Sequence, residues 1–154
     1  MNFRRAIGTI ILDPSGNLIV FQRSDFPSSW QCPEGGIDEG ETSEEALVRE
    51  LHEEIGLETK DFDILKKTKN FIRYSYEGGV TQGNFNGQEK QFFLIKLKKS
   101  VAEIKFRYDN VAEEIEFLAY RIIGKDEIRG DELASLLPKF KIELYKRVMV
   151  EFEL

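Results

Sequence analysis

The sequence predicts a mixed α/β sandwich built as one domain over residues 1–154. Segments rich in β-branched and aromatic residues alternate with a few helical segments along the chain. A glycine-rich loop leads into the first helical segment, which carries a dense group of carboxylates. Strands that alternate with helices bury their apolar faces against one another in a layered core. The 154 residues are enough to form such a core.

The chain is expected to open with a β-hairpin. Residues 3–12 are rich in β-branched side chains and predict a buried strand, and residues 18–23 predict a second one. Residues 13–17 between them read Asp-Pro-Ser-Gly-Asn, a cluster typical of turns. Arg4 and Arg23 stand near the ends of these strands, either as surface charges or as contacts to a ligand.

A helix is predicted from about residue 43 to residue 55. Thr42 and Glu45 have the three-residue spacing of a capping box at its start. Gly56 can adopt the left-handed conformation that ends a helix, so its expected role is structural. Four residues at helical spacing form the apolar stripe: Leu47, Val48, Leu51 and Ile55.

The same helix carries three carboxylates on one face, beside the apolar stripe. Residues three and four apart lie together on a helix, so Glu50, Glu53 and Glu54 converge. Clustered carboxylates repel one another unless a cation lies between them, and oxygen ligands suit hard ions such as Mg²⁺ or Mn²⁺. Arg49 is expected to support this group by linking Glu41 to one of the ligand carboxylates.

The remaining chain adds strands and two further helical segments. Residues 62–74, 91–97 and 115–123 predict strand material, and the glycine-rich residues 77–88 predict a loop or hairpin tip. A short helical segment is expected at residues 126–137, before Pro138. The last helix, about residues 139–152, is predicted to bury four side chains at four-residue spacing: Phe140, Leu144, Val148 and Phe152.

Composition narrows the class of protein further. The chain contains no apolar run of the ~20 residues that span a membrane, and its start lacks the organisation of a secretory signal. The single cysteine, Cys32, excludes an internal disulfide, and a cytoplasmic location is expected.

The net charge of −6 is unevenly distributed along the chain: residues 34–54 have a net charge of −8, and the remaining residues have a net charge of +2. Bound metal ions would reverse the local sign, so a nucleic-acid end is not excluded as substrate.

The segment from residue 35 to residue 57 resembles the signature of the Nudix hydrolases at every fixed position and at the same spacing. These residues are Gly35, Glu41, Arg49, Glu50, Leu51, Glu53, Glu54, Gly56 and Leu57. The resemblance implies a Nudix-type α/β/α sandwich with a mixed central sheet and a catalytic loop-helix. It also implies metal-dependent hydrolysis of a diphosphate linked to another group. The expected metal ligands are Gly35, Glu50, Glu53 and Glu54, with one further carboxylate outside the signature.

Outside the signature the chain looks most like bacterial RNA pyrophosphohydrolases and the similar dinucleoside polyphosphate hydrolases. The matching segments include residues 29–31, 70–74, 87–88 and 140–149. This similarity implies removal of pyrophosphate from the 5′-triphosphate end of RNA. It makes Glu114 the extra carboxylate, with Glu113 and Glu116 as alternatives. The implied substrate contacts are Arg4, Arg23, Ser29, Tyr74, Phe140 and Lys141, although Phe140 is equally consistent with a place in the core.

Several points stay open at this stage. Any of Glu53, Glu54 and Glu114 could act as the general base. Dinucleoside polyphosphates or free nucleoside triphosphates are the alternative substrates, and a non-catalytic binding module is the alternative class. Glu34 stands where the RNA enzymes commonly have glutamine. The sequence does not determine the number of metal ions or the oligomeric state, for which a homodimer is one alternative.

Overall fold

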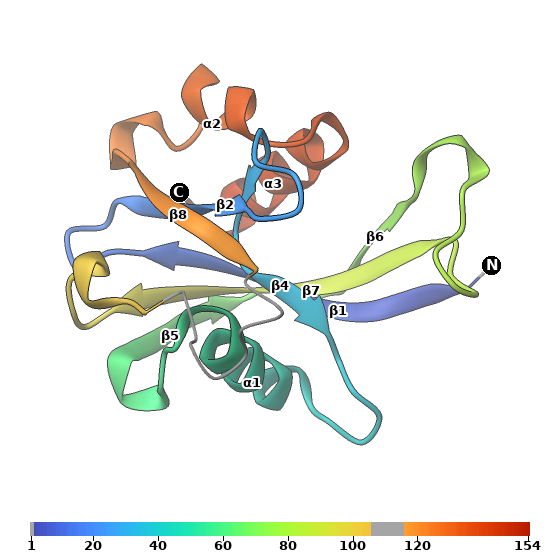
Figure 1. Ribbon diagram of the computed structural model, residues 1–154, viewed down its shortest axis with the longest axis horizontal. Helices are drawn as coiled ribbons and strands as arrows, with labels where there is room; N and C mark the ends of the chain where they lie inside the picture. The colour runs from blue at the N-terminus through green and yellow to red at the C-terminus, as the bar shows by residue number, and fades with distance from the viewer. Residues whose placement is uncertain (1, 106–115) are drawn as a thin grey trace.

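The computed structural model describes residues 2–105 and 116–154. Glu113 and Glu114 lie outside the described residues, as does the first residue of the strand predicted at 115–123. Within the described chain, a twisted sheet lies between two helical layers (Figure 1). The predicted α/β/α sandwich with a mixed sheet is therefore confirmed.

The sheet has eight strands among the described residues. They are β1 (Phe3–Leu12), β2 (Leu18–Arg23), β3 (Trp30–Gln31), β4 (Glu34–Gly36), β5 (Phe62–Lys67), β6 (Ile72–Ser75), β7 (Gly87–Leu97) and β8 (Phe117–Ile123). The main path runs β3-β2-β1-β7-β5, with β4 paired to β1, β6 to β7 and β8 to β2. The β1–β7 pair is parallel and the other pairs are antiparallel, including the expected β1–β2 hairpin.

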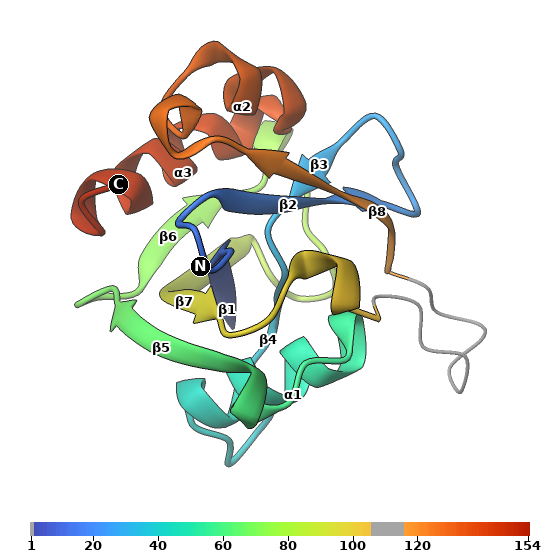
Figure 2. The same cartoon turned by 90° about the vertical axis from the view of Figure 1, so that its left-hand side faces the viewer.

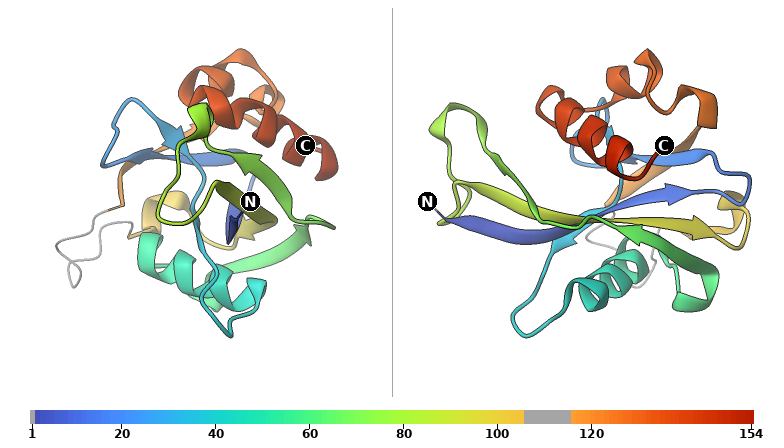
Figure 3. Two further views of the ribbon diagram at one scale, coloured as in Figure 1. Left: turned by 90° about the vertical axis from the view of Figure 1, so that its right-hand side faces the viewer. Right: turned by 180° about the vertical axis from the view of Figure 1, so that it is seen from behind.

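Helix α1 (Ser43–Ile55) covers one face of the sheet, and α2 (Asp131–Leu136) and α3 (Lys139–Glu151) cover the other (Figures 2 and 3). Each face has its own apolar cluster, one beneath α1 and one beneath α2 and α3. Short 3₁₀ turns complete the described chain: η1 (Thr59–Asp61), η2 (Glu77–Gly79), η3 (Val101–Glu103) and η5 (Lys125–Glu127). No helix in the described segments is long and apolar enough to cross a membrane.

Helix α1 begins and ends where its capping residues predict. The Thr42 hydroxyl accepts from the Glu45 backbone N–H, and the Glu45 carboxylate accepts from the Thr42 N–H, both at 3.1 Å. Gly56 ends the helix with φ of 67°, the left-handed conformation. Leu47, Leu51 and Ile55 are fully buried against the sheet. These boundaries fix which face of α1 carries the carboxylates.

Other boundaries differ from the prediction. The strand material expected at 62–74 is two strands, because the chain breaks after Lys67, where the Thr68 side chain accepts a hydrogen bond from the Phe92 backbone at 3.0 Å. Strand β7 starts at Gly87, not at residue 91, and the segment 126–137 is a 3₁₀ turn followed by the six-residue α2.

The prediction that Phe140 is buried with the rest of its helical stripe is wrong. Its side chain is 45% exposed, whereas Leu144, Val148 and Phe152 are buried. Phe140 lies in the first turn of α3, where it packs beside Tyr74 at a ring-centroid distance of 6.2 Å. The four-residue spacing therefore continues one turn beyond the part of α3 that packs on the core.

Candidate active site

Strand β4 brings the glycine-rich loop directly against α1. A side-chain carbon at Gly35 would overlap the carboxyl group of Glu50, and one at Gly36 would overlap the guanidinium of Arg4. Adjacent strand residues point to opposite faces, so Glu50 and Arg4 approach β4 from opposite sides. Two adjacent glycines therefore let an acidic and a basic side chain meet the same short strand.

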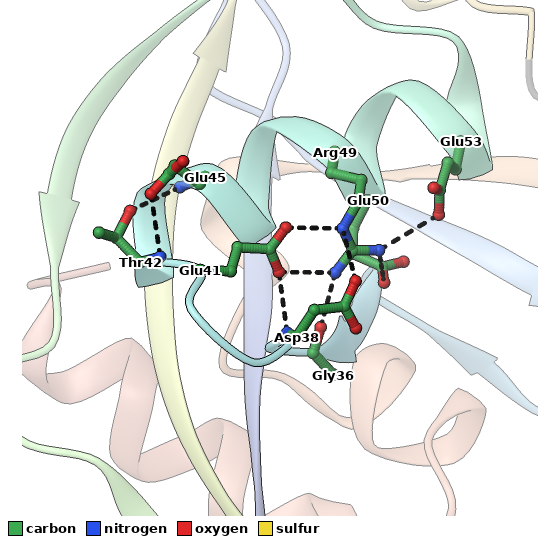
Figure 4. Close-up of polar contacts among 8 residues, drawn as sticks. All are labelled: Gly36, Asp38, Glu41, Thr42, Glu45, Arg49, Glu50 and Glu53. Atoms are coloured by element: carbon green, nitrogen blue, oxygen red, sulfur yellow. Dashed lines mark hydrogen bonds and ion pairs between the residues drawn. The ribbon is translucent and has the colours of Figure 1, made fainter.

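Arg49 binds carboxylates from the loop before α1 and from α1 itself (Figure 4). Its Nε and Nη2 atoms donate to the two carboxylate oxygens of Glu41 at 2.8 and 2.9 Å. Its Nη1 atom donates to Glu50 at 2.8 Å, and Nη2 also donates to the Gly36 carbonyl at 2.8 Å. The hydrogen bonds from Arg49 hold the pKa of Glu41 at about 2 and raise the pKa of Arg49 itself. The predicted link from Glu41 through Arg49 to a carboxylate of the helix is present.

The three helix carboxylates differ in their surroundings. The Glu50 side chain is only 13% exposed, whereas Glu53 is 56% exposed and accepts from Arg49 Nη1 at 3.3 Å. Glu54 is half-buried, and its Oε2 atom is buried without a hydrogen-bond partner among the described residues. Burial first, and then the negative charge of Glu50, raise the pKa of Glu54 well above its usual range. A cation would relieve the repulsion between these two groups.

The residues fit a divalent metal by their chemistry. They supply carboxylate oxygens, one of which is buried and unpaired, beside a glycine with no side chain to fill the space. Such oxygens are the preferred ligands of hard divalent ions. The side chains do not yet form a finished site: within the described chain no group of three or more His, Cys, Asp or Glu residues is arranged around one point. Glu53, turned to Arg49, would have to rotate to join a ligand set.

A cleft of about 480 Å³ opens beside Gly35 on the α3 side of β4. Five of the six predicted substrate contacts line it, together with Gly35: Arg4, Arg23, Tyr74, Phe140 and Lys141. Ser29 is buried, at 7% exposure, and does not line the cleft. Of the three candidates for the extra carboxylate, Glu116 is described and lines the cleft. The fold thus gathers residues from β1, β2, β4, β6 and α3 around one cavity.

Arg23 and Glu116 lie at the same part of this cleft. Arg23 donates to both oxygens of Asp25, at 2.9 and 2.6 Å, and these bonds raise its pKa. Burial, followed by the negative charge of Asp25, raises the pKa of Glu116. Glu116 is therefore a carboxylate whose ionised form would be stabilised by an added cation.

The base of the cleft contains a charged cluster, which we call the Glu34 cluster: Lys90, Glu34 and Lys141. Lys90 Nζ lies 2.7 Å from Glu34 Oε2, and Lys141 Nζ donates to Glu34 Oε1 and to Gln31 Oε1. Burial alone would raise the pKa of Glu34, but the two ammonium groups outweigh it and hold that pKa at about 2. Sequence reasoning missed Lys90, which stands in the polar first half of β7 between Glu89 and Gln91, where nothing in the sequence marks it as buried.

Two aromatic rings stand over this cluster. Tyr74 and Phe140 pack with their planes tilted by 38°, and the Tyr74 hydroxyl donates to Gln88 at 2.9 Å. Lys90 Nζ lies 5.1 Å from the Tyr74 ring centroid, and Lys141 Nζ lies 5.7 Å from that of Phe140. The exposed Phe140 ring offers a stacking surface next to fixed polar groups.

The sequence of this chain is similar to those of known proteins over most of its length. A family model described as the NUDIX domain matches residues 2–140. A protein of Wolbachia pipientis (strain wPip) named RNA pyrophosphohydrolase is 34% identical, and the match covers 97% of this chain and 89% of that protein. One of the same name from Edwardsiella ictaluri is 35% identical over 97% of this chain and 82% of its own length.

Solved structures share the fold at lower identity. The dihydroneopterin triphosphate pyrophosphohydrolase of E. coli superposes with a TM-score of 0.71 at 18% identity, covering 98% of this chain and 99% of that one. A C. elegans Ap4A hydrolase complex superposes with a TM-score of 0.61, also at 18% identity, covering 96% of this chain and 98% of that one.

Proposed function

The chain belongs to the NUDIX family, and from this membership we propose that it removes pyrophosphate from the 5′-triphosphate end of RNA and leaves a 5′-monophosphate. Proteins that are named RNA pyrophosphohydrolase and align over 97% of this chain support the choice of RNA. The single observation that carries the proposal is one cleft whose lining joins Gly35, the glycine that contacts Glu50, to the carboxylate Glu116 and to the exposed Phe140 ring. The helix carboxylates Glu50, Glu53 and Glu54 are not among the described residues that line it. A 5′ nucleotide needs carboxylates with metal for the phosphates and an aromatic surface for the base.

Nudix hydrolases work with divalent metal ions, and we propose Mg²⁺ or Mn²⁺ here. Glu50, Glu53, Glu54 and Gly35 would hold the metal, together with a carboxylate of the 113–116 segment, of which Glu116 already lines the cleft. When bound, the metal would supply positive charge against the phosphates and Lewis acidity at the scissile diphosphate. Arg49 would keep Glu50 oriented through the bond that it already makes.

The cations of the cleft would bind the phosphate chain. Arg4 lies against Gly36 and lines the cleft, so its guanidinium would donate to phosphate oxygens of a substrate held there. A guanidinium suits phosphate oxygens because it donates in a planar fork. Arg23, held by Asp25, would add a second positive charge across the cleft.

A carboxylate with a raised pKa is suited to take a proton from the attacking water near neutral pH. Glu54 has this property through burial and its neighbour Glu50. Glu53 and Glu114 remain the other candidates for the base. In this proposal the chain works as one domain over residues 1–154, in the cytoplasm.

One observation favours a second substrate class. Tyr74 lies seventeen residues beyond the signature, which ends at Leu57, and by the family resemblance a tyrosine there is typical of dinucleoside polyphosphate hydrolases. In the structure it lines the cleft beside Phe140. Two aromatic rings in one cleft would also suit the two bases of a dinucleoside polyphosphate, because each ring can stack on a base. Dinucleoside polyphosphates are therefore the alternative substrate.

A product assay tests the proposal. RNA carrying a 5′-triphosphate is incubated with the protein and Mg²⁺, Mn²⁺ or a chelator, and the 5′ end and the released phosphates are identified. We expect pyrophosphate and a 5′-monophosphate end only when a divalent metal is present. Release of single orthophosphates, or turnover unaffected by the chelator, would overturn the proposed reaction.

A further inference from the structure

A hydroxyl group from α3 holds the backbone just before the strand that carries Gly35. Cys32 lies between β3 and β4, and its backbone N–H donates to Tyr145 Oη at 3.0 Å. Both residues are buried, each with 1% exposure, and they lie 113 positions apart in the chain. The family signature runs from Gly35 to Leu57, so it includes neither residue.

The contact lies where the chain changes its pairing partner. Strand β3 pairs with β2, whereas β4 pairs with β1. At the change, the Thr9 N–H donates to the Pro33 carbonyl at 2.9 Å, but Pro33 has no N–H of its own. The Cys32 N–H is therefore the last backbone donor before β4. A buried N–H without an acceptor is unfavourable, and the Tyr145 hydroxyl supplies that acceptor.

The position of Tyr145 is itself fixed by the core. Tyr145 lies on the buried face of α3, and its ring meets the Phe92 ring edge-on, with centroids 6.1 Å apart and planes at 82°. The Phe92 ring fills the space over Gly8, where a side-chain carbon would overlap it. Gly8 is the register partner of Glu34 in the β1–β4 pair. The hydroxyl is thus placed by packing that includes the strand beside β4.

Helix α1 holds the same segment from the opposite layer. Arg49 Nη2 donates to the Gly36 carbonyl at 2.8 Å. Gly35 lies between the two held positions, Cys32 and Gly36, and contacts the Glu50 carboxyl group with no room for a side chain. A shift of Gly35 relative to Glu50 would therefore strain one of the two bonds.

We propose that Tyr145 is a positioning residue for the metal site. Through the Cys32 N–H, its hydroxyl holds β4 so that Gly35 and Glu50 keep the relative position that a divalent ion needs. Tyr145 itself touches neither metal nor substrate. Groups behind the ligands of a metal set its affinity by orienting those ligands. The inference rests on the metal site of the proposed function and not on the choice of RNA as substrate.

Lys141, one turn before Tyr145 on α3, contacts this segment in a different way. Its Nζ atom donates to side-chain oxygens of Gln31 and Glu34, and these side chains can rotate without moving the backbone. Tyr145 binds the backbone directly. The competing role for its hydroxyl is structural only: it satisfies a buried N–H and has no effect on the metal site. That role predicts a loss of stability with unchanged metal binding.

Tyr145→Phe separates these roles, because it keeps the ring and removes the hydroxyl. Mn²⁺ binding to the protein without substrate is measured from the paramagnetic resonance signal of free Mn²⁺. We expect the Kd for Mn²⁺ to rise by about tenfold, as changes behind metal ligands produce. Amide hydrogen exchange at Gly35, three residues from the deleted bond, should become faster because the segment opens more easily. An unchanged Kd would overturn the inference.

The matched control is Thr68→Val, which removes a hydroxyl group in the same kind of bond. The Thr68 hydroxyl accepts from the Phe92 backbone N–H at 3.0 Å, and Thr68 is fully buried. Thr68 lies between β5 and β6 and does not line the cleft. Its melting temperature should fall about as much as that of Tyr145→Phe, whereas its Kd for Mn²⁺ should stay at the wild-type value. Equal weakening of Mn²⁺ binding in the two variants would overturn the inference.

Turnover gives a second measurement. With any substrate that the wild type hydrolyses, Tyr145→Phe should need about tenfold more Mn²⁺ for half-maximal turnover. The same fractional loss at every Mn²⁺ concentration would overturn the inference, because the defect would then lie outside the metal site.

The Mn²⁺ titration also separates this inference from the RNA activity. It needs no substrate, so weaker Mn²⁺ binding in Tyr145→Phe would support the inference even if triphosphorylated RNA were not hydrolysed. RNA hydrolysis by the wild type together with an unchanged Kd would overturn the inference alone. If Tyr145→Phe lacks a cooperative melting transition, the wild type decides. Coupling between two sites is reciprocal, so Mn²⁺ should slow amide exchange at Cys32, and unchanged exchange there would overturn the inference.

Discussion

Gly35 and Glu50 are in such close contact that residue 35 has no room for a side chain: a carbon there would overlap the Glu50 carboxyl group. Glu50 is held from its other side by Arg49, at 2.8 Å. The carboxylate is therefore clamped between a backbone and a guanidinium. Fixed orientation of this kind is what a metal ligand requires, because outer groups set the geometry of the inner ones.

Gly35→Ala should displace Glu50 and lower metal-dependent turnover by about tenfold or more, as loss of a group that positions a ligand does. Divalent-metal affinity, measured by titration, should weaken with it. The control is Gly124→Ala, where φ is −55° and an added carbon meets nothing within 4 Å. Unchanged metal affinity in Gly35→Ala would contradict the clamp.

Glu54→Gln should lower turnover by about 10² or more, the range of general acid–base contributions. The metal-free protein should melt at the same temperature or higher, because the neutral amide removes repulsion from Glu50 in a half-buried site. The raised pKa gives the sign: the native state holds the proton more tightly, so the wild type loses stability as pH rises through that pKa. In Glu54→Gln the folding stability should not fall with rising pH in this way.

Glu39→Gln is the charge-matched control for that experiment. Glu39 is exposed and lies in the loop before α1. It should leave both turnover and the pH profile of melting close to wild type. Near wild-type turnover of Glu54→Gln with saturating Mg²⁺ would remove Glu54 from the mechanism.

Glu34 should stabilise the fold at neutral pH and lose this effect in acid, which is the opposite pH dependence to that expected for Glu54. Its pKa is held at about 2 by Lys90 and Lys141, below its ordinary value of 4.5. A depressed pKa means that the contribution is complete above about pH 4.5 and is lost as pH falls through about 2. Urea unfolding of wild type and Glu34→Gln between pH 6 and pH 3 measures it. The stability gap should shrink toward low pH, and a constant gap would refute the ion-pair account.

Phe140→Ala should lower activity on triphosphorylated RNA by about tenfold or more, because stacking on an aromatic ring contributes ~1–3 kcal/mol per base. Since the ring is 45% exposed, the loss of folding stability should be only about 1 kcal/mol. Phe152→Ala, at the far end of α3 and 2% exposed, should instead cost ~3–5 kcal/mol. Comparable stability losses in the two variants, with no change in RNA activity, would show that Phe140 serves packing and not base stacking.

The parts of the structure that depend on short-range patterns were predictable from the sequence. The capping box at Thr42, the left-handed Gly56 and the apolar stripe of α1 are all set by neighbours within a few residues. A link from Glu41 through Arg49 to a ligand carboxylate was also predicted, and Glu50 is a carboxylate that Arg49 contacts.

The parts that depend on pairing between distant strands were not predictable. Lys90 meets Glu34 only because both β4 and β7 pair with β1. Phe140 follows the spacing of buried α3 residues, yet it lies at the cleft because Tyr74 of β6 meets it there. Periodicity identifies a face of a helix, but it does not show where the sheet beneath that face ends.

Substrate preference tests the account most directly. The values of kcat/KM for pyrophosphate release from triphosphorylated RNA, and for hydrolysis of a dinucleoside tetraphosphate and a free nucleoside triphosphate, are measured with the same metal and buffer. The account predicts the highest value for RNA, with a 5′-monophosphate end as product. A higher value for either free nucleotide, or no RNA turnover with Mg²⁺ or Mn²⁺, would contradict it.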